Sequence, residues 1–367
     1  MDSLLSNIWE AIRQPAITFE VALESGDPTY YRSLLKLLFL GLRFHGSGKD
    51  QAQNMPTDFR ASSKMVQSKP VTGIVLEILD RVVAQGLQEV NAFIHAKPGE
   101  SSPQDIALLT GILQSCLRIP GIEFCYSQIV TIFETSKSAR VATSLFSWSD
   151  TLAIDGDPIY GELSILFLLE LSTVPAMAEQ IAIGGILGHI SSANITSYLR
   201  KNAVSPFAEG VGIQRCYSIW VRGILPLLLN LLDAVGAAIA AEVSLFLAQF
   251  PTLLNQSVEA LDPPESSRIA LKTHSKHITL SMCSEAHTLS LIVLVLNAFR
   301  NSNAGLEIAD VKWDAAGMLE NVDFWVGSKN ILRGKILPMG ARDLALFKSK
   351  VRLLILLLFK DPVSIVF

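Results

Sequence analysis

Three histidines and one cysteine lie close together in the sequence at a spacing that could bind a metal ion. They are His274, His277, Cys283 and His287. Side chains of these types are common zinc ligands, and a structural zinc site takes four of them. On one continuous helix, about 100° per residue places the two pairs on roughly opposite sides. One ion cannot reach both pairs unless the helix breaks, so we interpret the group as two exposed histidines, a core cysteine and a half-buried histidine.

Carboxylates occur in two places where acid–base or cation chemistry is conceivable. The stretch Asp155–Asp157 holds two, but the other positions of a calcium-binding loop are missing and Pro158 begins a helix. We therefore predict a turn and a helix cap. Glu162 and Glu170 are eight residues apart, which puts them on one face of the next helix. Because no partner acid or base accompanies them, we predict that they form the solvated edge of that helix.

Glycine-rich stretches at 183–188 and 209–212 could cradle a phosphate. The first lacks the lysine and hydroxyl residues of a P-loop, and the second is too short for a dinucleotide fingerprint. We predict helix ends there, where glycine adopts positive φ. No nucleophile elbow and no Cys/His or Ser/His arrangement has a recognisable context. The sequence therefore predicts no catalytic, cofactor-binding or metal-binding residue, and no cofactor.

Basic residues gather toward the end of the chain. Residues 326–361 hold eight Lys or Arg and two acids, whereas acids outnumber bases between residues 140 and 200. One interpretation is a basic end that meets an acidic partner or nucleic acid. We favour the other, a solvated face of the last helices, because no aromatic residues are interleaved to stack bases. The residues to test as a protein-contact surface are Arg342, Lys348, Lys350 and Arg352.

The elements that would position these residues are helices. Apolar residues recur at helical spacing, and no sustained alternation of period two is present. Asp or Ser stands directly before Pro at four places, which favours helix starts because Pro has no amide to leave unsatisfied. These four are Asp27-Pro28, Ser102-Pro103, Asp157-Pro158 and Asp262-Pro263. Helices of average length would number about twelve to sixteen.

The helices are apolar over wide arcs, so each must pack on more than one neighbour. We predict an all-α fold, an α-solenoid superhelix of stacked helix pairs or triplets that is degenerate and HEAT- or armadillo-like. A single solenoid would cover residues 1–367, with a flexible insertion at residues 46–69, which are rich in Ser, Gln, Lys, Gly and Asp. The predicted core positions include Leu166, Leu169, Leu228, Leu232, Val293 and Leu296.

Composition limits the class of protein. The chain has 367 residues, of which 50% are apolar and only 17% charged, with a net charge of −4. These values exclude disorder over most of the length and a globally basic nucleic-acid binder. The long apolar runs are interrupted by acids such as Asp233, Glu242 and Glu285. We therefore interpret them as buried helices of a soluble protein, with a membrane span as the alternative.

One long string is typical of a known family. Residues Tyr160–Leu199 read YGELSILFLLELSTVPAMAEQIAIGGILGHISSANITSYL. This string resembles the C-terminal region of the nucleoporin 188 family, in a fungal version, and the stretches Leu113–Arg118 and Trp220–Phe250 agree with it. Members of that family are large scaffold proteins of the inner ring of the nuclear pore. The shared stretches are helices typical of the family and contain no catalytic motif.

The resemblance implies a non-enzymatic α-helical solenoid that is the C-terminal fragment of a much longer protein. It implies a place at the nuclear pore complex in the nuclear envelope, and a role in pore architecture and in nucleocytoplasmic transport of protein and mRNA. Other inner-ring nucleoporins are the expected partners, and binding of phenylalanine-glycine repeats is a hypothesis that the family brings. No small-molecule substrate, no direct nucleic-acid contact and no transmembrane segment are expected.

Two alternatives stay open at this point. One is a soluble karyopherin or armadillo-type transport receptor, or a cargo adaptor, which would share the stacked helices. The other is an all-α enzyme with an unrecognised pocket, which would need converging carboxylates or histidines of perturbed pKa.

Overall fold

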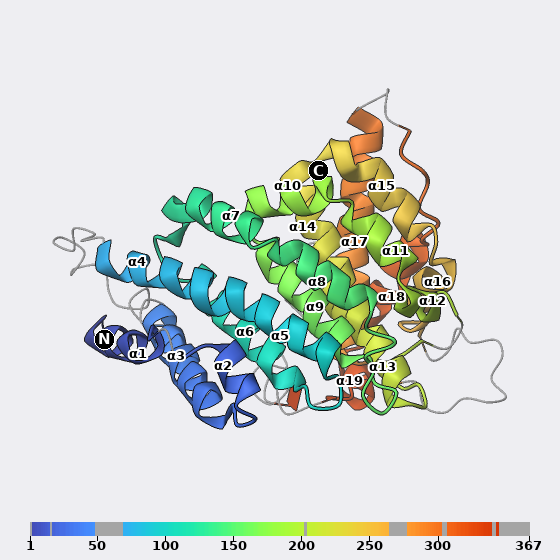
Figure 1. The fold of residues 1–367 in the computed structure, drawn as a ribbon. Helices are drawn as coiled ribbons and strands as arrows, with labels where there is room; N and C mark the ends of the chain where they lie inside the picture. Colours follow the sequence, from blue (N-terminus) through green and yellow to red (C-terminus); the bar gives the residue numbers. More distant parts are fainter. Residues whose placement is uncertain are drawn as a thin grey trace, which may run out of the picture. The chain divides into compact units, whose positions relative to one another are not determined.

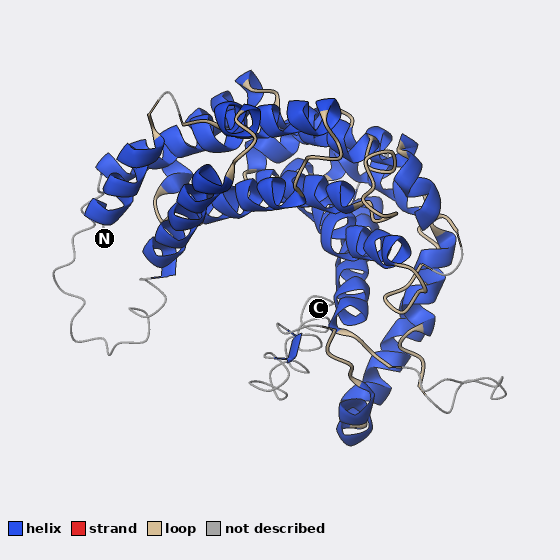
Figure 2. Ribbon diagram, turned by 60° about the horizontal axis from the view of Figure 1, so that its bottom comes forward, coloured by secondary structure: helices blue, strands red, loops and turns tan. Residues whose placement is uncertain are grey.

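A computed structural model of the chain describes residues 2–14, 17–47, 69–201, 204–263, 277–302, 307–339 and 343–344. Most of these residues are helical, and among them only two isolated β-bridges occur (Figure 2). The chain divides into two compact units. The N-terminal unit holds Met1–Leu152 and Ile159–Gly184, and the C-terminal unit holds Ala153–Pro158 and Gly185–Phe367.

In the described residues of the N-terminal unit there are ten α-helices, labelled in Figure 1. They are α1 (Asp2–Ile12), α2 (Phe19–Glu24), α3 (Thr29–Ser47), α4 (Lys69–Ile78), α5 (Gln85–Ala96), α6 (Pro103–Leu117), α7 (Tyr126–Thr135), α8 (Ser138–Ser147), α9 (Ile159–Leu171) and α10 (Pro175–Ile183). Helix α6 packs against α3, α5 and α9, and α9 also packs against α8. The α6 side chains Ile106, Leu109 and Leu113 are fully buried, so the core of this unit runs along α6.

The C-terminal unit contains nine α-helices in the described residues. They are α11 (Ile186–Ser192), α12 (Asn194–Leu199), α13 (Val211–Ser218), α14 (Leu225–Val235), α15 (Ala237–Leu247), α16 (Pro251–Glu259), α17 (Leu280–Ser302), α18 (Ala315–Gly327) and α19 (Lys329–Lys335). Helix α17 packs against α14, α15 and α16. Leu289, Ile292 and Leu296 of α17 are buried, as are Leu228 and Leu232 of α14, which makes α17 the centre of this core.

The predicted Pro-marked helix starts are confirmed where the structure describes them. Helix α6 begins at Pro103, α3 at Thr29 and α9 at Ile159, each at or directly after the marked proline. The Asp27 carboxylate accepts a hydrogen bond from the Thr29 amide at 3.1 Å. Hydrogen bonds from the Thr29 side chain and from this amide lower the pKa of Asp27. The fourth marked start is followed by residues outside the described part of the chain.

Two long helices contain a wide internal turn. In the N-terminal unit, α4 and α5 join through a π-helical turn at Leu79–Ala84, which makes one helix of residues 69–96. In the C-terminal unit, α13 and α14 join through a π-helical turn at Ile219–Ile224, which makes one helix of residues 211–235. Such turns leave one backbone position without its regular partner, and they occur often at functional sites.

Two of the described helices are long and apolar enough to cross a membrane by length and composition. They are Val211–Val235 and Leu280–Ser302, and two bent helix pairs would raise the number to four if each counted as one span. The two helices pack against each other, and 56% and 44% of their most apolar windows are buried inside the unit. Much of their apolar surface thus serves the core of the unit itself, and the expectation of no membrane-spanning segment stays a prediction.

Two expectations about the fold need correction. The 19 α-helical segments of the described residues form 17 helices, because π-helical turns join two pairs of them. This number is higher than expected because helices such as α2 and α12 have only 6 residues. Of the predicted core positions, Leu166 and Leu169 are only half-buried, whereas the other four are buried. Helix α9 is apolar on every side, so its sequence does not reveal which side is covered. The flexible insertion at residues 46–69 stays a prediction, because its residues 48–68 lie outside the described part.

Candidate functional site

The predicted basic contact surface lies beyond the described structure. Arg342, Lys348, Lys350 and Arg352 are all outside the described residues. Lys329 and Arg333, at the start of the same basic region, are exposed on α19, as a solvated face requires. The surface formed by the four predicted residues stays a prediction.

The histidine and cysteine group is distributed as a helix dictates. His277 is exposed just before α17, and Cys283 is buried inside it, as predicted. His287 is exposed and not half-buried, and His274 lies outside the described residues. Burial raises the pKa of the Cys283 thiol to about 12, so it stays protonated at neutral pH. Among the described residues, no group of three or more His, Cys, Asp or Glu could hold a metal ion.

One buried carboxylate with two hydrogen-bond donors was not predicted from the sequence. Glu285 of α17 is 3% exposed. The Tyr217 hydroxyl donates to its Oε2 at 2.6 Å, and the Trp220 indole Nε1 donates to its Oε1 at 2.9 Å. Tyr217 lies in the last turn of α13 and Trp220 in the π-helical turn, so the widened helix presents both donors toward α17. The sequence contains two hints of this contact. Tyr217 and Trp220 are three residues apart, which places them on one helix face, and Glu285 is an acid within an apolar run.

Burial dominates the electrostatics of this cluster. It raises the pKa of Glu285 to about 7, against the two hydrogen bonds, which act to lower it. Burial and the nearby Glu285 charge also raise the pKa of Tyr217 far above its usual value. Each oxygen of the Glu285 carboxylate has one hydrogen-bond donor. Because its pKa is raised to about 7, Glu285 changes protonation near neutral pH. This arrangement joins α17 to the long helix 211–235, and it places no activated nucleophile beside the carboxylate.

The stretch Asp155–Asp157 forms a tight turn, as predicted. Ile154 and Asp157 exchange two backbone hydrogen bonds, of 3.0 and 2.9 Å. The two residues between them have positive φ, 50° for Asp155 and 79° for Gly156. Positive φ at both central positions is the mark of the type I′ hairpin turn, for which Asp-Gly is a favoured pair.

Asp157, which the sequence predicts as a helix cap, also pairs with a residue far away in the sequence. Its carboxylate binds the Arg215 guanidinium of α13 in a bidentate pair, Nε to Oδ1 and Nη2 to Oδ2, both at 2.9 Å. A fork of two parallel hydrogen bonds is stronger than the single bond that a cap offers. Helix α13 also approaches the turn closely, because a Cβ on Gly212 would lie 2.4 Å from the Gly156 carbonyl oxygen. Gly212 thus allows this contact, while Gly210 stands directly before α13 with φ 106°, as predicted for a glycine at a helix end.

The predicted solvated edge of α9 is also wrong. Glu162 is 4% exposed and Glu170 is half-buried. The Gln114 side-chain amide of α6 donates to the Glu170 carboxylate, and burial raises the pKa of Glu170. Both acids are enclosed because α6 and α8 pack against α9. The expectation for the other glycine stretch is confirmed, since α10 ends at Ile183 and Gly185 has φ 70°.

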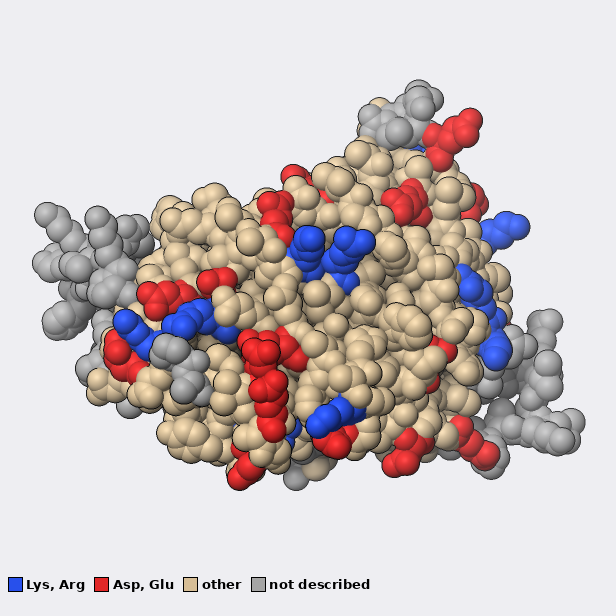
Figure 3. All heavy atoms as spheres, viewed as in Figure 1, with Lys and Arg blue, Asp and Glu red and all other residues tan. Residues whose placement is uncertain are grey.

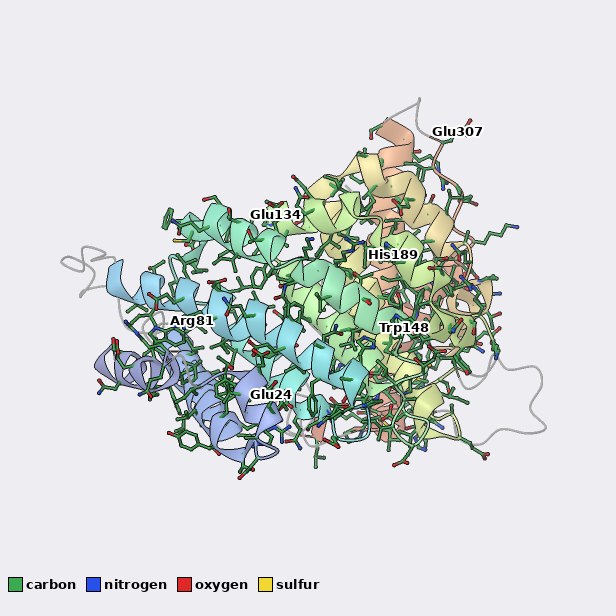
Figure 4. All side chains as sticks on the ribbon, viewed as in Figure 1. Glu24, Arg81, Glu134, Trp148, His189 and Glu307 are labelled. Carbon is green, nitrogen blue, oxygen red and sulfur yellow. The ribbon has the colours of Figure 1, made fainter. Side chains whose placement is uncertain are left out.

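Large apolar side chains remain exposed on several helices. The most exposed are Ile183 at 79%, Phe124 at 68%, Tyr30 and Phe44 at 66%, and Val211 at 61%. The Trp148 ring is also exposed (Figure 4). It meets the His95 ring edge to face, with the ring centroids 6.2 Å apart. Most of the face in Figure 3 is uncharged, with acids and bases in small separate groups. On this face the charged residues therefore form no large patch of one sign.

This helical architecture can be compared with known proteins. The family described as "Nuclear pore protein NUP188 C-terminal domain" matches residues 4–354. The chain belongs to this family. The resemblance read from Tyr160–Leu199 is thereby confirmed, and so is the all-α solenoid fold class.

Relatives of the NUP188 family share much of the sequence. Nucleoporin NUP188 of Chaetomium thermophilum is 40% identical over 350 residues, which are 87% of this chain and 18% of that protein. Nucleoporin nup184 of Schizosaccharomyces pombe is 29% identical over 282 residues, 76% of this chain and 17% of that protein. The chain therefore spans less than a fifth of the length of these curated relatives.

A solved NUP188 structure has a similar fold. It is a Nup188 fragment from Myceliophthora thermophila, with a TM-score of 0.76 and 42% sequence identity, and the match covers 94% of this chain and 88% of that one. The relatives are nucleoporins, which are components of the nuclear pore complex in the nuclear envelope. The family supports a scaffold role at the pore.

Proposed function

We propose that this chain is a non-catalytic scaffold segment of the inner ring of the nuclear pore. In this role it supports pore architecture and nucleocytoplasmic transport, and it binds other inner-ring nucleoporins. The observation that carries the proposal is the family match over residues 4–354. Two physical features support it: helices whose apolar sides are used in packing, and polar groups such as Glu285 and Asp105 that hydrogen-bond neighbouring helices.

Residence time at the pore tests the scaffold proposal against a transport receptor. The chain would be fused to a fluorescent protein within its full-length parent and bleached at the nuclear rim. A scaffold recovers slowly because its subunits stay in place, whereas a receptor exchanges within seconds. Fast recovery of the rim signal would contradict the proposal and favour the karyopherin-type alternative.

Binding of phenylalanine-glycine repeats is the finer part of the proposal. Apolar residues on two adjacent helices support it, since Tyr198 of α12 and Val211 of α13 are 45% and 61% exposed and these helices pack together. Shallow apolar surfaces between helices suit a short extended peptide that carries single aromatic anchors.

Immobilised peptides test this binding directly. Retention of the chain on a Phe-Gly repeat peptide, compared with a Ser-Gly peptide, should persist at high salt because apolar contacts are not screened. Tyr198→Ser with Val211→Ser should reduce it, while Leu319→Ser, at a residue 51% exposed on α18, serves as the matched control. Absence of salt-resistant retention would remove this part of the proposal and leave the scaffold role intact.

The extent of the solenoid is a further part of the proposal. The two compact units are each helical, and we expect residues 1–367 to act as one solenoid segment. Urea unfolding, followed in parallel by circular dichroism and tryptophan fluorescence, should then show one shared transition. Two separated transitions would contradict a single cooperative solenoid.

A further inference from the structure

Helix α3 carries an exposed apolar stripe. Tyr30, Leu37, Leu40 and Phe44 are 66%, 52%, 47% and 66% exposed. Their spacing of i, i+7, i+10 and i+14 places all four along one side of the helix. In heptad terms Tyr30, Leu37 and Phe44 occupy position a and Leu40 a position d, which is the seam that a second helix covers in a coiled coil.

The opposite side of α3 is firmly held in the N-terminal unit. Leu35, Leu38 and Leu42 are fully buried, and α3 packs against α1 and α6 (Figure 1). A Cβ on Gly41 would lie 3.5 Å from an Ile8 methyl group, so α1 approaches α3 closely. The exposed stripe is therefore a fixed surface on a rigid helix, and it is not the side through which α3 joins its own unit.

Charge on α3 is of one sign. Lys36 and Arg43 are exposed, seven residues apart, and each comes directly before an a-position residue, which is position g of the heptad. Neither makes an ion pair with another described residue, and the Arg43 guanidinium lies 5.5 Å from the centre of the Phe39 ring. The sequence of α3 contains no Asp or Glu, although the chain carries a net charge of −4.

The third basic residue of α3 is already occupied. Arg32 forms a bidentate pair with Asp105 of α6, with both nitrogen–oxygen distances 2.7 Å, and Asp105 is 2% exposed. The Arg32–Asp105 pair therefore fixes α3 to the core. Lys36 and Arg43 remain as the charges that border the stripe.

We infer that the stripe on α3 is a docking surface for an amphipathic helix whose apolar seam is flanked by acidic residues. Leucine-like side chains of that helix cover the four apolar residues, and its Asp or Glu residues meet Lys36 and Arg43. Charge complementarity selects this occupant, because a neutral or basic helix would leave both cations facing no partner. The stripe spans about 21 Å from Tyr30 to Phe44, so the partner helix needs about four turns. This surface and its partner chemistry go beyond the proposed scaffold role and do not depend on phenylalanine-glycine binding.

A designed peptide tests the docking surface with the whole chain. The acidic probe is an acetylated and amidated peptide of about three heptads, with Leu at positions a and d and Glu at e and g, which keeps it from pairing with itself. The control peptide has Lys in place of every Glu. Binding to the labelled peptides is measured by fluorescence anisotropy, and the oligomeric state of the chain by analytical ultracentrifugation.

Variants assign the binding to α3. We expect Leu37→Ser with Phe44→Ser to weaken binding of the acidic probe at least tenfold, and Lys36→Glu with Arg43→Glu to do the same and to favour the lysine peptide. Leu319→Ser removes a similarly exposed apolar side chain on α18 and should leave binding unchanged. All these side chains are exposed, so the variants keep the circular dichroism and thermal transition of the parent chain.

Several outcomes would overturn the proposal. Absence of saturable binding of the acidic probe up to about 1 mM, equal affinity for the lysine peptide, or equal affinity of the α3 variants would each do so. Self-association of the chain that disappears with Leu37→Ser and Phe44→Ser would assign the stripe to a second copy instead. Competition of a Phe-Gly peptide with equal affinity at the same residues would assign it to phenylalanine-glycine repeats.

Discussion

The two long helices with π-helical turns differ in what their turns bury. In the N-terminal unit, the turn at Leu79–Ala84 buries only apolar side chains, and Arg81 points outward to donate to the Arg13 carbonyl oxygen at 3.0 Å (Figure 4). In the C-terminal unit, the turn at Ile219–Ile224 buries Trp220, whose indole donates to the buried Glu285. The same backbone irregularity therefore serves dry packing in one unit and a buried polar contact in the other.

Each unit also contains an indole–carboxylate hydrogen bond. Trp9 donates to Glu77 at 2.8 Å, and Trp220 donates to Glu285 at 2.9 Å. Both indoles are buried, but Glu77 is exposed whereas Glu285 is enclosed. Because hydrogen-bond length is nearly equal, burial of the carboxylate is what distinguishes the two contacts energetically. A wide turn or a Trp–Glu contact alone does not identify a functional site.

The largest effect should come from removing the indole of the polar turn. Trp220→Ala leaves a large cavity, which costs about 3–5 kcal/mol, and it deprives a buried carboxylate oxygen of its donor, which costs about 1–3 kcal/mol more. Leu79→Ala in the apolar turn pays the cavity cost alone. Urea unfolding should show Trp220→Ala to be the less stable variant by at least about 1 kcal/mol. Equal losses of unfolding free energy would mean that the polar contact of the second turn adds nothing to stability.

The pH dependence of stability should be the next largest effect. The pKa of Glu285 is about 7 in the folded chain and 4.5 when exposed. Its contribution is therefore complete below pH 4.5 and is lost as pH rises through 7, a change of about 3 kcal/mol. Glu285→Gln has no such proton and should lose this part of the slope between pH 5 and pH 7.5 in urea unfolding. An unchanged slope would show that Glu285 titrates as an exposed acid.

The two long helices should respond in opposite directions to Gly→Ala substitution. Gly212→Ala drives a Cβ to 2.4 Å from a backbone oxygen, so we expect a loss of about 1–3 kcal/mol. Gly73→Ala in α4 meets nothing within 4 Å and should gain about 0.5–1 kcal/mol from helix propensity. Thermal unfolding of both variants measures the difference. Equal changes in thermal stability for the two substitutions would mean that α13 does not contact the Asp155–Asp157 turn closely.

The smallest effect is expected at the exposed carboxylate. Glu77→Gln keeps an acceptor oxygen for the Trp9 indole and removes a charge that water already solvates. We expect its free energy of unfolding to stay within about 0.5 kcal/mol of the parent and its pH dependence to match the parent between pH 5 and pH 7.5. A change in pH dependence as large as that expected for Glu285→Gln would mean that burial does not set the difference between the two Trp–Glu contacts.

Local features were the part of the fold that could be predicted from the sequence. Proline-marked starts such as Ser102-Pro103 depend on neighbouring residues alone, and helix α6 begins at Pro103. The tight turn at Asp155–Asp157 is equally local, because its backbone angles suit Asp-Gly. The role of Asp157 could not be predicted in this way, since its partner Arg215 is 58 residues away in the sequence.

Periodicity was less informative where a helix is apolar on all sides. On α9 the predicted core residues Leu166 and Leu169 are half-buried while Phe167 and Leu168 are fully buried. Glu162, predicted to be solvated, is buried because α6 and α8 enclose its helix. No count of apolar residues distinguishes these sides, because which neighbour covers each side is set by distant parts of the chain.

By itself, the sequence determined that this protein is a charge-poor stack of helices and, through one string of residues, that it belongs with the nucleoporins. Helical period, caps and turns act over a few residues, so they can be read along the chain. Only the tertiary structure decided that Glu285 receives two buried hydrogen bonds, that Asp157 binds Arg215, and that α3 keeps an apolar stripe exposed. These features depend on which helices meet, and that is decided by packing among residues far apart in the sequence.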